Sequence, residues 1–358
     1  MGKWLNRALR ILLLAVYLVV AGKSAALAQK QEPVVDELVL LNWSDYMDPE
    51  LLEEFQASTG AKVTQVYFET DEMRDDMLLG TNGAGYDLVV ANGPGLTNYI
   101  RRGWLAPLTL REVPNLRHIE TRWLEAFPEA RGHAVPLFWG TTGIAYRKDL
   151  VSAPVTSWRQ LFQPEEALRG KIVMIKSSAD TIGMALKCLG YSANSTDPAQ
   201  LAEVERLLKG QKPFVQTYSY VSLTEESSLV SGTTWMAMMY SGDALMLKDI
   251  DEQIAYVVPE EGGNLWVDYL GVMASSSKKE LAARFINFLH EPKNMARLAQ
   301  YVHYAPPNRA AQSLLPKEFL DDPVVYPPQE TIGKSEFYQQ LPPRTVKERN
   351  RIFSEILR

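Results

Sequence analysis

Short apolar segments alternate with amphipathic helices over the first third of this 358-residue chain. Residues 38–42, 62–68 and 86–90 are apolar or β-branched and predict strands. The segment from Asp48 to Gly60 has an acidic N-cap, a proline at the first helical position and a terminal glycine, so it predicts a helix. A second helix is expected over 71–79. Strands and helices in this order indicate a β-α-β sheet of the α/β class.

Later segments extend the same pattern and suggest where the chain changes lobe. Further strands are expected at 171–175, 233–239 and 270–273, and a further helix at 282–289. Glycine- or proline-marked joins lie at Thr141–Gly143, Glu260–Asn264 and Ala305–Asn308. Two or three thin connections predict two α/β lobes with a ligand cleft between them. We assign the first lobe to residues 29–142 and 268–308, and the second to 143–267 and 309–358.

The N-terminus has the pattern of an export signal. Basic Lys3, Arg7 and Arg10 precede the apolar run Ile11–Ala21, and Ala26–Ala28 supplies small residues for signal peptidase. The alternative is an uncleaved anchor, but the run is short for a hydrocarbon core of ~30 Å. No cysteine follows the run to carry a lipid. We therefore predict a signal peptide over 1–28, cleavage after Ala28 and a periplasmic location.

Composition and motifs exclude several classes of protein. The single cysteine, Cys188, cannot form an intramolecular disulfide, and the four histidines have no metal-binding spacing. The net charge of −6 becomes −10 after removal of the four basic residues in 1–28, which argues against nucleic-acid binding. No nucleotide loop or nucleophile elbow is present. We expect no enzymatic activity, no cofactor and no metal.

Aromatic and acidic residues gather directly after three predicted strands or joins, at Asn42–Tyr46, Tyr240–Asp243 and Trp266–Tyr269. An aromatic face attracts an ammonium group by about 0.5–2 kcal/mol, and a carboxylate adds charge-assisted hydrogen bonds. Such clusters therefore suit an organic cation. Two alternatives stay open, namely aromatic rings packed beside helix caps, and stacked rings that bind a sugar.

The stretch Leu41–Tyr46 resembles the opening motif of bacterial periplasmic polyamine-binding proteins, the spermidine/putrescine type of ABC-transporter substrate-binding protein. The similarity continues in order over nearly the whole mature chain, through Tyr86–Val90, Thr141–Tyr146, Ser241–Asp243, Trp266–Asp268, Tyr304–Asn308 and Tyr326–Pro328. The resemblance implies a two-lobe periplasmic binding protein fold that closes on its ligand like a hinged clamp.

The resemblance also implies a set of ligand-binding residues: Trp43, Ser44, Asp45, Tyr46, Asn92, Asp180, Tyr240, Asp243, Trp266, Asp268 and Tyr304. Three positions depart from the family pattern. Asp180 stands where members carry glutamate, Tyr240 where tryptophan is usual, and Asn92–Pro94 where a serine-containing loop is usual. The identity of the polyamine therefore stays open among putrescine, spermidine and norspermidine.

The resemblance allows two kinds of partner. The first hypothesis is a monomeric binding protein that presents a polyamine to the permease of a membrane ABC importer. The alternative is a sensor that docks on the periplasmic part of a membrane signalling protein, such as a cyclase, phosphodiesterase or kinase. Some family members have that second role.

Overall fold

The computed structural model describes residues 36–358, so the predicted signal peptide and its cleavage site lie outside the described residues. Glu37–Arg358 forms one compact unit. None of its helices combines the length and the apolar character that crossing a membrane requires.

One mixed sheet runs through the described part of the chain in the order β2-β1-β3-β9-β4-β7-β5-β6, with β8 paired to β4. β1 is parallel to β2 and β3, whereas β9 is antiparallel to both β3 and β4. The strands are β1 Glu37–Trp43, β2 Lys62–Phe68, β3 Leu88–Asn92, β4 Ala134–Arg147, β5 Ile172–Met174, β6 Val215–Tyr218, β7 Met236–Tyr240, β8 Ile254–Val257 and β9 Asn264–Val272.

The predicted helix after β1 is α2, Pro49–Thr59, and both capping residues that the sequence indicated are present. The Asp48 carboxylate accepts a hydrogen bond from the Glu50 backbone N–H, and Gly60 ends the helix in the left-handed conformation. The α-helices are α2 Pro49–Thr59, α3 Asp71–Thr81, α4 Gly93–Arg101, α5 Thr121–Glu125, α6 Arg159–Phe162, α7 Ser178–Cys188, α8 Pro198–Gln211, α9 Ser241–Ile250, α10 Lys279–Leu289, α11 Pro292–Val302, α12 Arg309–Gln312, α13 Lys317–Asp321, α14 Gln329–Lys334 and α15 Pro343–Leu357.

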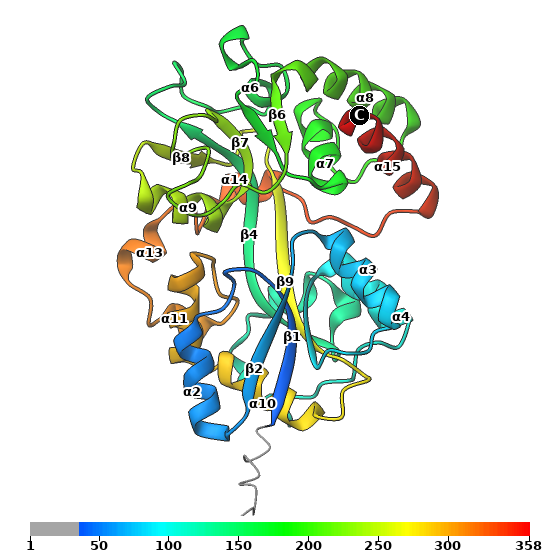
Figure 1. Cartoon of the computed structure of the whole chain (residues 1–358), viewed down its shortest axis with the longest axis vertical. Coiled ribbons are helices and arrows are strands. Elements are labelled where there is room, and N and C mark those ends of the chain that lie inside the picture. The colour runs from blue at the N-terminus through cyan, green and yellow to red at the C-terminus, as the bar shows by residue number, and fades with distance from the viewer. Residues whose placement is uncertain (1–35) are drawn as a thin grey trace, which may run out of the picture. The chain divides into compact units, whose positions relative to one another are not determined.

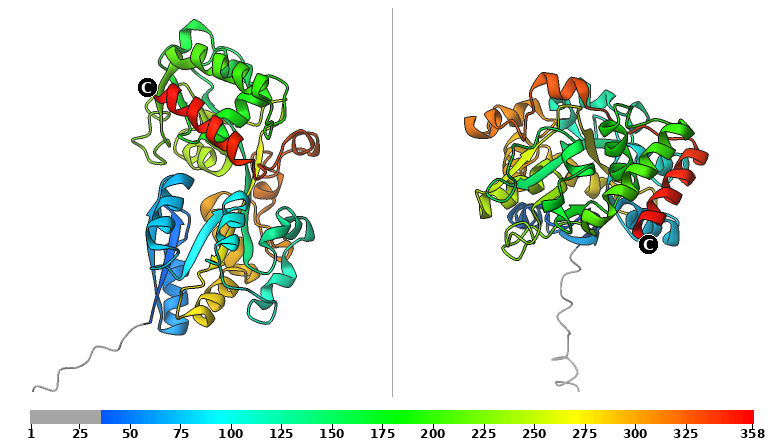
Figure 2. Two further views of the ribbon diagram at one scale, coloured as in Figure 1. Left: turned by 90° about the vertical axis from the view of Figure 1, so that its right-hand side faces the viewer. Right: turned by 90° about the horizontal axis from the view of Figure 1, so that it is seen from above.

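Two of the large buried cores in the described unit lie toward opposite ends of β4, which Figure 1 shows running beside β9 from one half of the unit to the other. The first core packs β1 and β3 against α2, α10 and α11, with residues such as Leu40, Phe55 and Phe285. The second packs β5 and β7 against α7, α8 and α15, with Met238 and Ile352 among its members. Figure 2 shows α15 lying along α7 and α8. The predicted two-lobe α/β fold is confirmed.

The first two predicted joins lie in or beside strands rather than in exposed loops. Thr141–Gly143 lies inside β4, and Asn264, paired with Thr142, begins β9. Gly143 is needed there because an added Cβ would lie 2.4 Å from the Val257 carbonyl oxygen. β4 therefore continues from one core to the other without a break.

The third predicted join, Ala305–Asn308, is followed by residues that still pack in the first core. Ala311 and Leu315 are buried there, and α12 contacts α11. The residues just after Asn308 therefore pack with the first core. The exact lobe boundaries remain a prediction.

Candidate functional site

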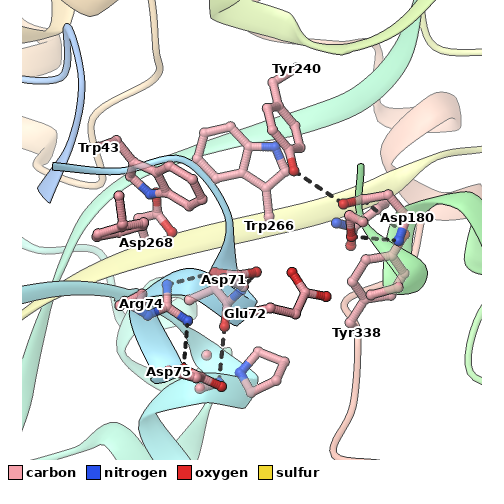
Figure 3. Close-up of a pocket in the computed structure, with 18 of the residues that line it drawn as sticks. Trp43, Asp71, Glu72, Arg74, Asp75, Asp180, Tyr240, Trp266, Asp268 and Tyr338 are labelled. Atoms are coloured by element: carbon pink, nitrogen blue, oxygen red, sulfur yellow. Dashed lines mark hydrogen bonds and ion pairs between the residues drawn. The ribbon is translucent and has the colours of Figure 1, made fainter. Parts of the chain in front are cut away.

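A cleft of about 990 Å³ is lined by residues from both lobes (Figure 3). Every residue that the sequence analysis selected contributes to its lining: Trp43, Ser44, Asp45, Tyr46, Asn92, Asp180, Tyr240, Asp243, Trp266, Asp268 and Tyr304. These residues are up to 261 positions apart in the chain (from 43 to 304), and the sheet brings them together. Whether each one contacts a ligand remains a prediction.

Strand ends and strand alternation place these side chains. β1 ends at Trp43 and is followed by a turn in which Asp45 adopts a left-handed conformation with φ 55°. β7 ends at Tyr240, and Asp243 lies in the first turn of α9. Within β9, Trp266 and Asp268 are two residues apart, so both side chains project from the same face of the strand. The cleft is therefore built at strand ends, as expected for α/β folds.

Aromatic rings form a continuous wall along the cleft. The Trp266 ring lies edge-on to Tyr304, with ring centroids 4.8 Å apart, and edge-on to Tyr240 at 5.9 Å. Tyr220 continues the wall between Tyr240, at 6.1 Å, and Trp43, at 6.2 Å. Flat apolar surfaces of this kind pack against the methylene groups of an alkyl chain and offer their faces to a cation.

Two buried carboxyl groups lie beside this wall. Burial raises the pKa of Asp268 to about 7, and the Asp71 carboxylate adds to that shift. Burial likewise raises the pKa of Asp243 to about 6, although the Tyr304 hydroxyl donates a hydrogen bond to its Oδ1 and opposes the shift. Tyr46 is buried close to both carboxyl groups. The raised pKa values indicate that burial in the cleft disfavours both negative charges.

A third buried carboxyl group, Asp180, lies in the first turn of α7. The hydroxyls of Tyr240 and Tyr338 each donate to it at 3.1 Å, and the Thr142 hydroxyl donates at 3.3 Å. Burial raises the pKa of Asp180 despite its hydrogen-bond donors. Within residues 36–358, no ion pair joins a basic side chain to Asp180, Asp243 or Asp268.

The N-terminal part of α3 adds charged residues that the sequence analysis missed. Arg74 is only 1% exposed, and its guanidinium pairs with Asp71 at 2.6 Å and Asp75 at 3.5 Å. Its Nε donates to the Tyr99 hydroxyl at 2.7 Å. Glu72 lies at the exposed rim, where partial burial and the Asp71 carboxylate raise its pKa. The sequence does contain a signal for these residues. The acid-rich segment Glu69–Asp76 directly follows β2, just as the aromatic–acid clusters follow other strands.

Asn92 lines the cleft, but its amide is already bonded within the protein. Its Nδ2 donates to Asp71 Oδ2 at 2.6 Å, and its Oδ1 accepts from the Gly95 backbone N–H at 2.9 Å, which caps α4. Asn92 therefore positions Asp71. Tyr220 and Tyr338 are two further lining residues that the sequence analysis missed.

The lining is strongly acidic. It contains eight carboxyl groups and three basic side chains, namely Asp45, Glu69, Asp71, Glu72, Asp75, Asp180, Asp243 and Asp268 against Arg74, Lys347 and Arg349. Of the basic groups, Arg74 is held by acids of α3, and Arg349 donates to the backbone carbonyls of Ala193 and Ser195. In the described part of the chain, no group of three His, Cys, Asp or Glu side chains is arranged to hold a metal. The arrangement suits an elongated organic cation.

Comparisons with known proteins agree with this geometry. The family of "Bacterial extracellular solute-binding protein" matches residues 50–326. The putrescine-binding periplasmic protein SpuD of Pseudomonas aeruginosa is 31% identical, over 95% of this chain and 96% of that protein. A norspermidine sensor of Vibrio cholerae is 31% identical, over 89% of this chain and 88% of the sensor.

A solved structure supports the same assignment. The spermidine/putrescine ABC transporter substrate-binding protein PotD of Streptococcus pneumoniae superposes with a TM-score of 0.77 at 29% identity, covering 90% of this chain and 98% of that chain. Fold, cleft position and sequence similarity over most of the length point to one group of proteins. The chain belongs to the bacterial extracellular solute-binding protein family.

Proposed function

We propose that this chain is a periplasmic polyamine-binding protein of the putrescine, spermidine and norspermidine class, without catalytic activity. The observation that carries the proposal is the set of three buried carboxyl groups, Asp180, Asp243 and Asp268, that form no ion pair with a basic side chain of residues 36–358 and adjoin an aromatic wall. The names of the relatives, which include putrescine-binding and norspermidine-sensing proteins, support the same ligand class.

The physical basis is charge compensation in a desolvated site. A buried charge without a partner costs several kcal/mol. A polyamine supplies two or more ammonium groups separated by methylenes, so it pairs with the carboxylates while its alkyl segments pack on the rings of Trp266 and Tyr304. Closure of the lobes removes water from these contacts and strengthens them.

We propose that the closed, monomeric protein presents its ligand to the permease of an ABC importer. The structural similarity to a transporter substrate-binding protein supports this role. The similarity to a norspermidine sensor supports the second candidate, docking on the periplasmic domain of a membrane signalling protein. In either role, export would remove residues 1–28 by cleavage after Ala28. Neighbouring genes for a permease and an ATPase, or for a signalling enzyme, would distinguish the two roles.

Replacement of Asp268 tests the ligand class. Asp268→Asn keeps the size of the side chain but removes the charge that faces the ligand. Loss of one partner from a buried charge pair costs roughly 2–5 kcal/mol, so polyamine affinity should fall about 30-fold or more. Calorimetric titration of wild type and variant with putrescine, spermidine and norspermidine measures the effect.

Asp76→Asn is a matched control, because Asp76 is an exposed acid of α3 that does not line the cleft. This variant has the same net charge as Asp268→Asn and should bind like wild type. If wild type binds no polyamine but binds sugars or amino acids, the proposed function is wrong. Affinity within threefold of wild type in Asp268→Asn would reject the role of Asp268.

A further inference from the structure

Three arginines are buried in the described part of the chain, and one of them, Arg349, has no acidic partner there. Arg74 and Arg147 each pair with two aspartates, whereas Arg349 forms no ion pair with a carboxylate of residues 36–358. A buried charge without a partner is unfavourable. Arg349 therefore indicates a carboxylate that joins it in another state of the protein.

The Arg349 side chain lines the cleft from the second lobe, on the buried face of α15. Its Nη2 donates to the backbone carbonyl oxygens of Ala193 and Ser195, each at 2.9 Å. Its Nε has no acceptor and is sealed from solvent. Nη1 has no acceptor within the described residues either, but it is not sealed, so it can receive a partner from the cleft.

Glu72 is the opposite case in the first lobe. It lies in the first turn of α3 and lines the cleft, and its carboxylate forms no ion pair within residues 36–358. Figure 3 shows its side chain extending from α3 toward Asp180 and Tyr338 of the other lobe. Burial raises the pKa of Glu72, and the Asp180 carboxylate across the cleft adds to that shift. The side chain is therefore close to the facing lobe.

Tyr338 lies where these two charges approach each other. Its hydroxyl donates to Asp180 Oδ1 at 3.1 Å, which fixes the ring in the wall of the second lobe. Burial lowers the pKa of Arg349, and the neighbouring Tyr338 opposes that shift. The unpaired acid of one lobe and the unpaired arginine of the other thus flank the same tyrosine.

We propose that Glu72 and Arg349 form an ion pair when the lobes close, and that this pair is a latch that holds the closed state. The inference rests on the proposed polyamine function. Gln340, just before α15, already donates to the Asn98 side chain of α4 at 3.1 Å, so the lobes approach each other on this side. Closure gives each unpaired charge a partner, and removal of water strengthens the pair.

The latch acts on the protein rather than on the ligand. A contact that exists only in the closed state shifts the open–closed equilibrium toward the state that binds polyamine. The apparent affinity then rises by the same factor for every ligand that requires closure. Loss of the latch should therefore weaken norspermidine and putrescine binding equally.

A double-mutant cycle tests the latch, with Glu72→Gln, Arg349→Met and the variant that carries both changes, each titrated calorimetrically with norspermidine and with putrescine. A hydrogen bond between charged groups corresponds to about a 10- to 100-fold change in affinity, and the position of Glu72 at the rim favours about tenfold. All three variants should lose about tenfold, because each lacks the same pair. Independent effects would instead multiply to about a hundredfold loss in the double variant.

Arg349→Met is the sharper single variant, because simple charge attraction predicts the opposite sign. Removal of a cation from an acidic cleft raises polyamine affinity if Arg349 plays no part in closure, whereas the latch predicts a loss. A crystal structure of wild type with norspermidine should also place a Glu72 carboxylate oxygen within about 4 Å of Arg349 Nη1. That measurement remains decisive if Arg349→Met fails to fold in a thermal melt.

Two matched controls make the same kinds of change outside the proposed pair. Glu69→Gln removes an exposed acid from the rim of the cleft. Arg344→Met removes an exposed arginine of α15 that does not line the cleft. Both controls should bind the two ligands within threefold of wild type, and a tenfold loss in both would overturn the latch.

The remaining outcomes separate the latch from the proposed function. Folded Arg349→Met that binds polyamine as tightly as wild type, or more tightly, overturns the latch while polyamine binding stands. A hundredfold loss in the double variant, or a ligand complex in which Glu72 and Arg349 stay apart, has the same meaning. Absence of any polyamine binding by wild type overturns the proposed function and the latch with it.

Discussion

At the residue scale, the cleft combines buried acids with a buried cation, Arg74, that is paired with acids of α3. Asp268 is 7% exposed, and its burial and the Asp71 carboxylate raise its pKa. The charge of Arg74 and hydrogen bonds from Tyr46 and Trp43 lower that pKa in part. A carboxyl group in this setting holds its proton to higher pH than it does in water. Ligand binding and proton release should therefore be linked.

The raised pKa of Asp268 predicts a pH effect on the stability of the ligand-free protein. In the unfolded chain the carboxyl group ionises near pH 3.8, whereas in the folded protein it ionises near pH 7. Between these values the folded state holds the extra proton, so this residue's contribution to the free energy of unfolding falls as the pH rises. The fall is at most about 1.4 kcal/mol per pH unit.

Urea unfolding of ligand-free wild type and Asp268→Asn at pH 5, 6 and 7.5 measures this contribution as a difference between the two proteins. The variant should become progressively more stable relative to wild type as the pH rises. Saturating norspermidine should reduce the difference, because an ammonium group stabilises the ionised carboxylate. A difference that is constant from pH 5 to 7.5 would reject the shifted ionisation.

At the element scale, the charged residues of α3 both stabilise the fold through ion pairs and line the cleft. Arg74 lies within the wall, with its guanidinium 5.2 Å from the Phe68 ring centroid, and its single charge pairs with Asp71 and Asp75. Glu72 lines the cleft beside them and forms no ion pair within the described residues. The helix therefore offers less negative charge to the ligand than its sequence suggests.

Arg74→Met should destabilise the protein by roughly 2–4 kcal/mol. Loss of one partner from a fully buried ion pair costs about 3–5 kcal/mol, and the smaller value here reflects Asp71 and Asp75 side chains that are 39% exposed. Arg102→Met is the control, because the Arg102 side chain is exposed and lies over the Trp104 ring, a contact worth about 1 kcal/mol or less. Urea denaturation compares the two variants, and equal midpoints would contradict the structural role of Arg74.

At the scale of the whole described unit, β4 and β9 join the two cores as paired strands, and the cleft lies where they pass between the cores. Bending of two strands requires small backbone changes over several residues, so the lobes can rotate without unfolding. We propose closure about Thr141–Gly143, Gly262–Gly263 and Ala305–Asn308. The last of these segments is followed by residues that pack in the first core.

Small-angle scattering should show a smaller radius of gyration with saturating polyamine than without it. Ligand that contacts both lobes favours the closed state, and this shift supplies the signal that either partner would recognise. Asp268→Asn should need a higher ligand concentration than wild type, by about 30-fold or more, to reach the same change in profile, because its affinity is reduced. Identical profiles for ligand-free and saturated wild type would contradict hinge closure.

The sequence alone determined the fold class and a set of residues that line the cleft. Local signals such as the Asp48 cap and the apolar strand 62–68 depend on neighbouring residues, so they could be recognised without a structure. Aromatic–acid clusters after strands identified Trp43, Asp243 and Asp268, because strand ends meet at the ligand-binding edge of an α/β sheet.

Tertiary structure alone decided which groups are paired and which are not. Arg74 and Asp71 resemble ordinary helix charges in the sequence, and Asn92 resembles a loop residue before a glycine and a proline. Their roles depend on burial and on the pairing of Asp71 with both Arg74 and Asn92. Such burial depends on residues far apart in the chain, and the free energy of a buried polar group is set by its contacts rather than by its local sequence.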